Sequence, residues 1–378
     1  SQTTTMAFQN VNGIRTKNSS LDESLNQTID TMDQYNISIL GISEHHLALG
    51  NHNTRRQLAD SFQKLRPRRI ANQFNSSLEN EQGGRLMGGT GIIALDSITG
   101  RIDPQGKEGD ILGRWSVMHL RRQHRAPVSV ITIYQVCKSP TNIIGDTAWH
   151  QQRRHLDLHM RHEHPRQAFM IDLTQCIKAL QQRNHAIVVG GDWNDWLGSP
   201  NSTLLAMCNN LQLVDPWAIK HPNALDFATH EKGQFRIDSV FVSPELQPAI
   251  QSIRYTPGGL LCTTDHRAVM IAFHTSVLFG NKITPPIPLQ PRAVRSNDKK
   301  AVTTFIETMH AHLTQHNAFA RSEAMEVEGT ICHELAEALD SLIGEAGDLG
   351  EKRCRRRRPQ WYSTELATTR YTVSLLRH

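Results

Sequence analysis

Short apolar runs typical of buried strands alternate with stretches of helical periodicity as far as residue 274, and this alternation limits the possible folds more than any other feature. Strand-like runs occupy residues 6–14, 37–46, 88–95, 128–136, 186–195, 235–243 and 265–273. Helical periodicity covers residues 21–35 and 146–184, with a break at His164-Pro165. Strands and helices that alternate in this way form sheets covered by helices. The sequence therefore predicts an α/β sandwich of mixed sheets.

The 378 residues are enough for one large α/β domain with an appendage. Between residues 281 and 300, four prolines and the loss of periodicity predict a linker. We therefore expect an α/β domain at residues 1–278, a Pro-rich linker at 279–300, a helical segment at 301–350, and at 351–378 an Arg-rich stretch followed by the start of a helix. The chain ends within that last helical pattern, so we expect it to lead into a further domain downstream.

Charge is nearly balanced, with 41 Lys and Arg against 36 Asp and Glu, but its distribution is uneven. The stretch "KRCRRRRP" at residues 352–359 is either a solvated tail or linker, or a localisation signal or nucleic-acid contact. The six cysteines show no CxxC spacing, so neither a zinc module nor a disulfide framework is indicated. Apolar runs stay well short of the roughly 20 residues that span a bilayer, and we expect no membrane insertion.

Polar residues follow the apolar runs at the points where strands should end. In a layered α/β fold such ends gather at one rim, so residues far apart in the chain can meet in one pocket. Taken singly, each is as easily explained as a turn or cap residue. The set is Asn10, Asn12, Glu44, Tyr134, Asp192, Asn194, Asp238, Asp265 and His266.

Together these residue types suit phosphodiester cleavage. Glu44 offers a hard oxygen ligand of the kind that Mg²⁺ or Mn²⁺ prefers. Asp192 could orient or deprotonate a water, and Asn194 could donate to a nonbridging phosphate oxygen. Asp238 could hold His266 in one tautomer, as a carboxylate does for an imidazole in many hydrolases.

Six stretches resemble, in order and spacing, the signature motifs of the endonuclease/exonuclease/phosphatase superfamily across residues 6–274. The resemblance implies a four-layered α/β sandwich and cleavage of phosphodiesters or phosphomonoesters with a divalent cation, usually magnesium. The stretches are "FQNVNGIR", "LGISEHHL", "ITIYQV", "VVGGDWND", "FRIDSVFVS" and "TTDHRAVM".

By motif, the resemblance assigns roles to particular residues. Asn10, Glu44 and Asp265 would hold the metal, and Asn12 and His46 would contact substrate. Tyr134 would touch the phosphate, Asp192 and Asn194 would act on the nucleophile and transition state, and Asp238 with His266 would form a dyad. Three positions depart from the family pattern: Asn12 replaces a common Asp, Ser43 replaces a Gln, and an expected Asn is missing near Cys137.

Within the superfamily, the stretches "SEHHL" and "FRIDSVFVS" are similar to those of retrotransposon endonucleases. The stretch "RRRRPQWYSTELATTRYTVSLLRH" at residues 355–378 resembles the segment that joins endonuclease to reverse transcriptase in long interspersed element-type retrotransposons. The resemblance implies nicking of DNA to leave a 3′ hydroxyl that primes reverse transcription, a reverse transcriptase domain in the same polyprotein, and action in the nucleus. Candidate backbone contacts are Arg66, Arg68, Arg69, His45 and His46.

Two other functions fit the same residues. One is a phosphatase or phosphodiesterase acting on a small molecule or lipid. The other is a DNA-binding module that has lost catalysis. This alternative is suggested by Asn12, which stands where the family commonly has an Asp. Near the central motif we expect Trp193 and Trp196 to pack in the core, and Gly190 and Gly191 to let the backbone approach a phosphate.

Overall fold

The computed structural model describes residues 3–14, 20–65, 69–76, 86–123, 125–137, 144–200, 202–225, 227–258, 264–280, 298–322 and part of 339–350. The chain divides into two compact units, Ser1–Ile287 and Pro288–His378. The Arg-rich stretch and helix start predicted at 351–378, and most of the predicted linker, lie outside the described residues.

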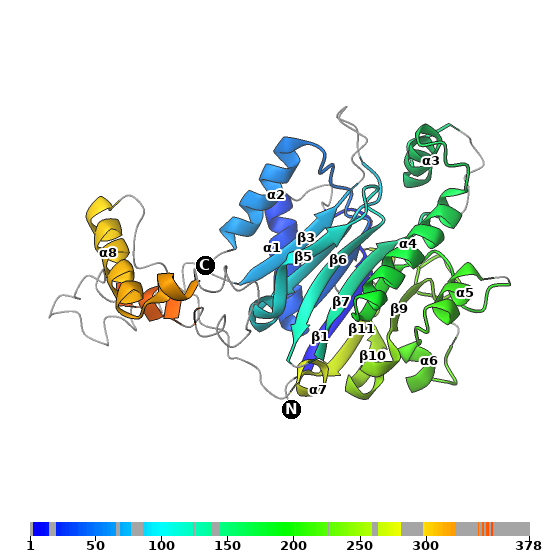
Figure 1. Cartoon of the computed structure of the whole chain (residues 1–378). Helices are drawn as coiled ribbons and strands as arrows, with labels where there is room; N and C mark the ends of the chain where they lie inside the picture. The colour runs from blue at the N-terminus through cyan, green and yellow to red at the C-terminus, as the bar shows by residue number, and fades with distance from the viewer. Residues whose placement is uncertain are drawn as a thin grey trace. The chain divides into compact units, whose positions relative to one another are not determined.

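The first unit contains two β-sheets packed face to face (Figure 1). One sheet has six strands in the order β10-β11-β1-β2-β4-β3, and the other has five in the order β5-β6-β7-β8-β9. The strands are β1 (Thr3–Asn10), β2 (Ile39–Ser43), β3 (Ile70–Asn75), β4 (Thr90–Leu95), β5 (Ile102–Gly109), β6 (Trp115–Arg122), β7 (Arg125–Tyr134), β8 (Ala186–Asp192), β9 (Asp238–Val242), β10 (Ile250–Tyr255) and β11 (Val269–His274).

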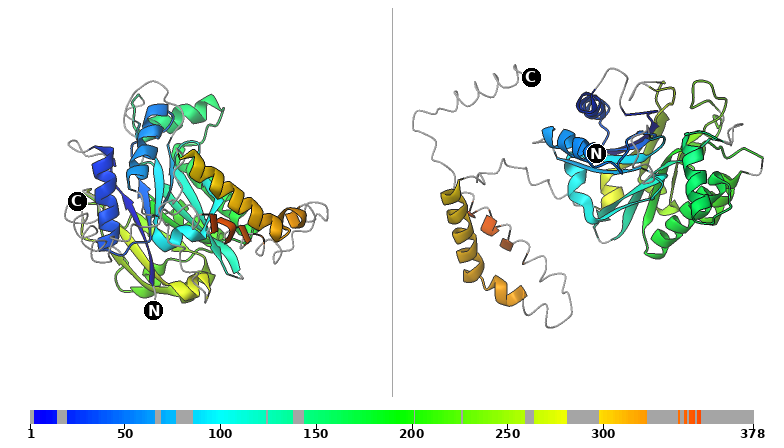
Figure 2. Two further views of the ribbon diagram at one scale, coloured as in Figure 1. Left: turned by 90° about the vertical axis from the view of Figure 1, so that its left-hand side faces the viewer. Right: turned by 90° about the horizontal axis from the view of Figure 1, so that it is seen from above.

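Helices cover the outer faces of both sheets, which gives the four layers that the sequence predicts (Figure 2). Helices α1 (Leu21–Gln34) and α2 (His52–Lys64) pack on the six-stranded sheet. Helices α4 (Pro165–Gln182) and α5 (Thr203–Asn210) pack on the five-stranded sheet. Two short helices, α6 (Pro216–Lys220) and α7 (Thr275–Phe279), follow later in the chain.

Alternation of side chains along each strand builds the layers. In β1, Met6 and Phe8 join the core between the sheets, while Ala7 joins the core under α1 and α2. In β8, Val188 faces the other sheet and Ile187 faces the α4 layer. Successive side chains of a strand point to opposite faces, so a strand buried on both faces reads as a continuous apolar run.

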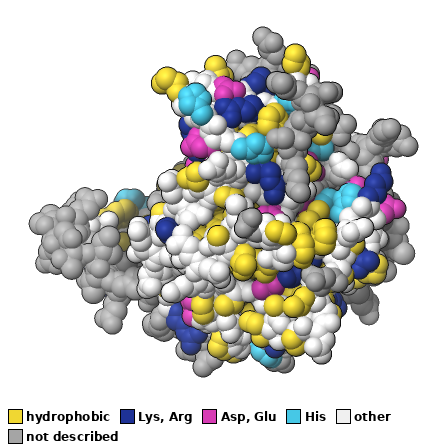
Figure 3. Space-filling view, turned by 90° about the vertical axis from the view of Figure 1, so that its right-hand side faces the viewer, with side chains coloured by type: hydrophobic (Ala, Val, Ile, Leu, Met, Phe, Trp, Pro, Cys, Tyr) yellow, Lys and Arg dark blue, Asp and Glu magenta, His cyan; other side chains and the backbone are white. Residues whose placement is uncertain are grey.

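Local sequence signals explain where the helices begin. Ser20 and Glu23 form a capping box at the start of α1. The break predicted at His164-Pro165 separates α3 (Ala148–Leu158) from α4, because Pro165 occupies the first turn of α4 and His164 caps it. Figure 3 shows the side of the molecule that carries α3 and α4, where hydrophobic side chains gather across the middle with basic and histidine side chains around them.

In the second unit, α8 (Lys299–Gln315) is an amphipathic helix within the segment predicted to be helical. None of the helices in the described parts of the chain is long and apolar enough to cross a membrane.

The two glycines of the central motif serve packing within the protein, and the approach of a phosphate at this point stays a prediction. A Cβ at Gly190 would lie 2.7 Å from the ring of Phe8, which reaches across from the other sheet. Gly191 has φ +141°, and a Cβ there would lie 2.2 Å from the carbonyl oxygen of Ile133. Only glycine allows both the close approach of the two sheets and this backbone conformation.

Candidate active site

Strand pairing brings the predicted polar residues to one rim. β1 and β2 are parallel with Asn10 opposite Ser43, and β7 and β8 are parallel with Tyr134 opposite Asp192. β8 also pairs with β9, so that Asp192 lies opposite Asp238. Since parallel strands end at the same edge, residues far apart in the sequence meet there.

Asn10 joins two carboxylates. Its Nδ2 donates to Glu44 Oε2 at 2.8 Å and to Asp192 Oδ2 at 2.8 Å. Its Oδ1 accepts the backbone N–H of Asn12 at 2.9 Å, which fixes the orientation of the amide. The Asn10 amide is therefore a neutral bridge between two acidic groups, and its role as a metal ligand stays a prediction.

Glu44 lies on a strained turn just after β2. Glu44 and His46 have φ of 56° and 58°, a region that non-glycine residues rarely adopt. Their N–H groups donate to the carbonyls of Gly89 and Gly88 at 2.8 and 3.0 Å, and these bonds hold the turn. Strain that the surrounding structure maintains in this way is a mark of functional sites.

The Glu44 carboxylate stays ionised although it is largely buried. Burial opposes its charge, but contacts with His46, Tyr134 and Asn10 outweigh burial and hold the pKa of Glu44 below its usual value. The hydroxyl of Tyr134 bonds to Glu44, and burial with the charge of Glu44 raises the pKa of Tyr134 well above its usual value. Tyr134 is 5% exposed and supports Glu44 from within, and its contact with a phosphate stays a prediction.

Asn194 is bound to its neighbours through both ends of its amide. Its Nδ2 donates to the carbonyl of Gln135 at 2.7 Å and to Asp192 Oδ2 at 3.1 Å, and its Oδ1 accepts from Cys137 Sγ at 3.4 Å. Its backbone N–H donates to Asp192 Oδ1 at 2.9 Å. These bonds orient Asp192, and the donation from Asn194 to a phosphate stays a prediction.

Asp238 and His266 form the predicted pair. His266 Nδ1 lies 3.0 Å from Asp238 Oδ2, and both side chains are buried. Burial works against a charged ring, but the charge and hydrogen bond of Asp238, with the charges of Asp192 and Asp265, outweigh it and raise the pKa of His266 to about 10. His266 is therefore an imidazolium at neutral pH.

Asp192 is the central group of the site. It is 1% exposed, and burial followed by the charge of Asp238 raises the pKa of Asp192 to about 7. Ligand atoms of Asp192, Asp238 and His266 lie within 4.8 Å of one another. A carboxylate with a pKa near 7 beside an imidazolium is a common arrangement for an acid and a base in catalysis.

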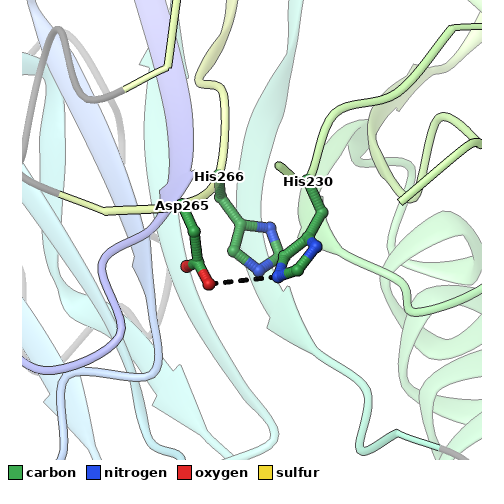
Figure 4. Close-up of side chains that lie close together, drawn as sticks. All are labelled: His230, Asp265 and His266. Carbon is green, nitrogen blue, oxygen red and sulfur yellow. Dashed lines mark hydrogen bonds and ion pairs between the residues drawn. The ribbon is translucent and has the colours of Figure 1, made fainter. Parts of the chain in front are cut away.

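Asp265 lies beside His266 and pairs with a histidine that the sequence analysis did not single out (Figure 4). His230 Nε2 is 3.1 Å from Asp265 Oδ2. Both residues line a pocket of about 450 Å³ that also includes Arg267. No motif marked His230, because its contact depends on loops that are distant in sequence.

The predicted substrate contacts differ in exposure. Asn12 is exposed, and the side chain of His46 is 5% exposed with its Nε2 3.7 Å from Glu44 Oε1. His45, a candidate for contact with the DNA backbone, is 1% exposed and bonds to the carbonyl of Asn75, so it is a structural residue. Of the three arginines predicted to contact the DNA backbone, Arg69 is partly exposed. Arg66 and Arg68 lie outside the residues that the structure describes.

Arg166, at the start of α4, also was not anticipated. It donates to the carbonyls of Val136 at 2.7 Å and Asn194 at 3.0 Å, and so ties the end of β7 to the loop after β8.

Trp193 is fully buried in the core, as predicted. Trp196 is partly buried and stacks on Phe235 with ring centroids 4.2 Å apart.

The residues present fit a divalent cation. The carboxylate of Glu44 is ionised and supplies hard oxygen atoms, and the bridging amide of Asn10 leaves a second carboxylate, Asp192, close by. Hard cations such as Mg²⁺ bind few protein oxygens and keep positions open for water or phosphate. Glu44 is the residue of this group best placed to hold such a cation.

Comparisons with known proteins identify the family and the fold. The family model described as "Endonuclease/Exonuclease/phosphatase family" matches residues 7–266, and no curated protein matches. Among solved structures, the AP endonuclease LMAP from Leishmania major is similar with a TM-score of 0.53 at 12% identity, over 72% of this chain and 88% of that chain. An AP endonuclease from Archaeoglobus fulgidus has a TM-score of 0.48 at 16% identity, over 72% of this chain and 100% of that chain. From the family match and the fold together, the chain belongs to the endonuclease/exonuclease/phosphatase family.

Proposed function

We propose that this protein is a magnesium-dependent DNA endonuclease that hydrolyses one phosphodiester bond and leaves a 3′ hydroxyl. One observation carries the proposal: Glu44, Asp192 and the Asp238–His266 pair form a continuous buried cluster at one rim. Glu44 is ionised, the pKa of Asp192 is raised to about 7, and His266 is an imidazolium at neutral pH, which are states that suit hydrolysis of a phosphodiester. The similar structure from Leishmania major is an AP endonuclease, which also favours a nuclease reaction.

Asp192 acts as the general base. Its raised pKa makes it a proton acceptor near neutral pH, and Asn194 and Asn10 hold both of its oxygens in place. Asp192 takes a proton from a water molecule, whose oxygen bonds to the phosphorus as the bond to the 3′ oxygen breaks. The departing 3′ oxygen takes a proton from solvent and becomes the 3′ hydroxyl. Positioned general bases contribute about 10²–10⁴-fold to rate.

His266 stabilises the charge that develops on the phosphate. Its Nδ1 is occupied by Asp238, so its Nε2 is left to donate to a phosphate oxygen. Asp238 keeps the ring charged and oriented. A divalent cation held by Glu44 would supply a further positive charge at the phosphate. Preorganised charges in a buried site need little rearrangement during the reaction.

We include in the proposal the setting that the sequence suggests, a retrotransposon polyprotein. In that setting the 3′ hydroxyl primes reverse transcription by a downstream domain, and the protein acts in the nucleus. Support comes from the stretch at residues 355–378 and the basic run beside it.

A plasmid assay tests the function. The full chain is incubated with supercoiled plasmid and Mg²⁺, with and without a chelator, and the products are separated by gel electrophoresis. We expect conversion to open circles only with the metal, and extension of the nick by a DNA polymerase reports the 3′ hydroxyl. An inert plasmid with tight DNA binding would indicate a decayed binding module. Release of phosphate from inositol phosphates without nicking would indicate a small-molecule phosphatase.

A further inference from the structure

His230 lies in the segment between α6 and β9, with its ring directed at Asp265 and His266 (Figure 4). Its Nε2 is 3.1 Å from Asp265 Oδ2, and its ring centroid is 4.7 Å from that of His266, at an interplanar angle of 72°. Edge-to-face contacts of this kind restrict how both rings can tilt. One side chain therefore contacts two adjacent residues of the site.

The hydrogen bonds of His230 fix its tautomer. The backbone N–H of Lys232 donates to Nδ1 of His230 at 3.1 Å, so Nδ1 carries no proton. The proton of the neutral ring is then on Nε2, which donates to Asp265. Ligand atoms of His230, Asp265 and His266 lie within 4.8 Å of one another, a spacing compatible with a metal. A protonated Nε2 cannot ligate a metal, so the geometry favours a hydrogen-bond donor at this position.

Backbone bonds connect the same segment to both halves of the dyad. Residues His230 and His266 form an isolated antiparallel bridge. Glu231 N donates to Asp265 O at 2.8 Å, and Arg267 N donates to Thr229 O at 2.7 Å. The hydroxyl of Thr229 accepts the N–H of Asp238 at 3.0 Å. Movement of this segment would therefore displace Asp238 and the Asp265–His266 pair together.

Asp265 depends on His230 for its orientation. The Asp265 side chain is 31% exposed, and the other described side-chain donor to it, Thr264 Oγ1, is 3.4 Å away. The hydrogen bond from Thr264 is weak compared with the bond of 3.1 Å that His230 makes to the same carboxylate. Without His230 the carboxylate would have several rotamers open to it.

We propose that His230 is a positioning residue for the nuclease reaction, which holds the Asp265 carboxylate through Nε2–H and the His266 ring through edge-to-face contact. The inference rests on the proposed function. Small misplacements of groups that act on the transition state cost up to about 100-fold in rate, so loss of this support should reduce kcat more than it changes KM.

Two substitutions separate the hydrogen bond from the packing. His230→Gln places an amide N–H where Nε2–H lies, and His230→Phe keeps a ring against His266 but removes the donor. His221→Phe is the matched control, since His221 also bonds through Nε2, to the carbonyl of Ile253, and packs on Trp217. All variants are made in the full chain, and their folding is checked by circular dichroism.

Steady-state nicking of plasmid is the first measurement. We expect His230→Phe to lower kcat about tenfold with little change in KM, His230→Gln to keep most of the wild-type kcat, and His221→Phe to match the wild type. A His230→Phe variant as active as wild type would overturn the proposal. So would a His230→Gln variant as slow as His230→Phe, because the donor would then not be what matters.

The tautomer is measured independently of activity, by ¹⁵N NMR of the histidine rings. We expect His230 to carry its proton on Nε2, and the His266 ring signals to move in His230→Phe but not in His221→Phe. A proton on Nδ1 of His230 would overturn the inference whatever the kinetics. If the wild-type protein fails to nick any plasmid, the proposed function fails, and the NMR result still decides whether His230 holds Asp265 and His266 as described.

Discussion

Two groups of buried charges in the first unit are built in opposite ways. At Arg114, which is 4% exposed, the guanidinium bonds to Asp110 at 2.7 and 3.0 Å and to Asp172 at 2.8 Å, and Arg161 bonds to both oxygens of Asp172. This cluster pairs two cations with two carboxylates. In the active site, Asp192 and Asp238 share one imidazolium, His266, and Glu44 is joined to Asp192 only through the neutral amide of Asn10.

The pKa values report the difference. Burial opposes the charges of both Arg114 and Asp172, but their partners outweigh it, raising the pKa of Arg114 and lowering that of Asp172. In the active site, burial and the charge of Asp238 raise the pKa of Asp192 to about 7. A balanced cluster stabilises the ionised forms and serves structure. An excess of carboxylates leaves a base that can take a proton and a place for an added cation.

The largest effect is expected from Asp192→Asn. We predict that nicking falls about 10²–10⁴-fold, because the amide cannot accept the proton of water. The raised pKa of Asp192 means that its charge destabilises the fold above about pH 7, and that this cost shrinks as the pH falls below 7 and is lost only near the usual pKa of 3.8. At pH 8 the variant should therefore be as stable as wild type or more so, as measured by thermal melting. A variant that nicks normally would exclude Asp192 as the base.

For the balanced cluster the opposite pattern is expected. Arg114→Met leaves Asp110 without its buried partner and should cost about 3–5 kcal/mol in the free energy of unfolding. The rate per folded molecule should be largely unchanged. The control is Arg56→Met, which removes an exposed pair with Asp60 and should cost less than about 1 kcal/mol. Urea unfolding measures both, and equal losses would contradict the comparison.

Glu44→Gln tests whether Glu44 holds the divalent cation. The amide keeps the shape of the side chain but removes the charge, so the Mg²⁺ concentration for half-maximal nicking should rise on the order of 10–100-fold. Isothermal titration with Mn²⁺ gives a readout that does not depend on catalysis. Unchanged affinity in both measurements would show that the cation is held elsewhere.

The smallest effect is the pH dependence of the wild-type rate. Because Asp192 must be ionised to act, kcat should fall about tenfold for each unit below about pH 7. The rate should stay level above that pH until His266 loses its proton near pH 10. A rate independent of pH between 5 and 7 would show that a group other than Asp192 accepts the proton.

Much of the fold followed from local patterns. Each strand-like run coincides with a strand of the structure, and the break at His164-Pro165 marks the start of α4. Strands β3, β5, β6 and β10 were not anticipated, since β3 and β5 are rich in polar residues and lie outside the apolar alternation. Roles were harder to assign than positions. Asn10, Asn194 and Tyr134 lie at the site, where they bond to Glu44 or Asp192, and the roles that the resemblance gave them stay predictions.

The sequence by itself determined which chemical groups stand at the ends of the strands, because strand alternation and the motifs are local properties of the chain. Tertiary structure alone decided which way the Asn10 amide points, the protonation state of Asp192, and the pairing of His230 with Asp265. These depend on burial and on distances of a few ångströms between residues that lie far apart in sequence. Hydrogen bonds and pKa values respond to those distances, and no local pattern encodes them.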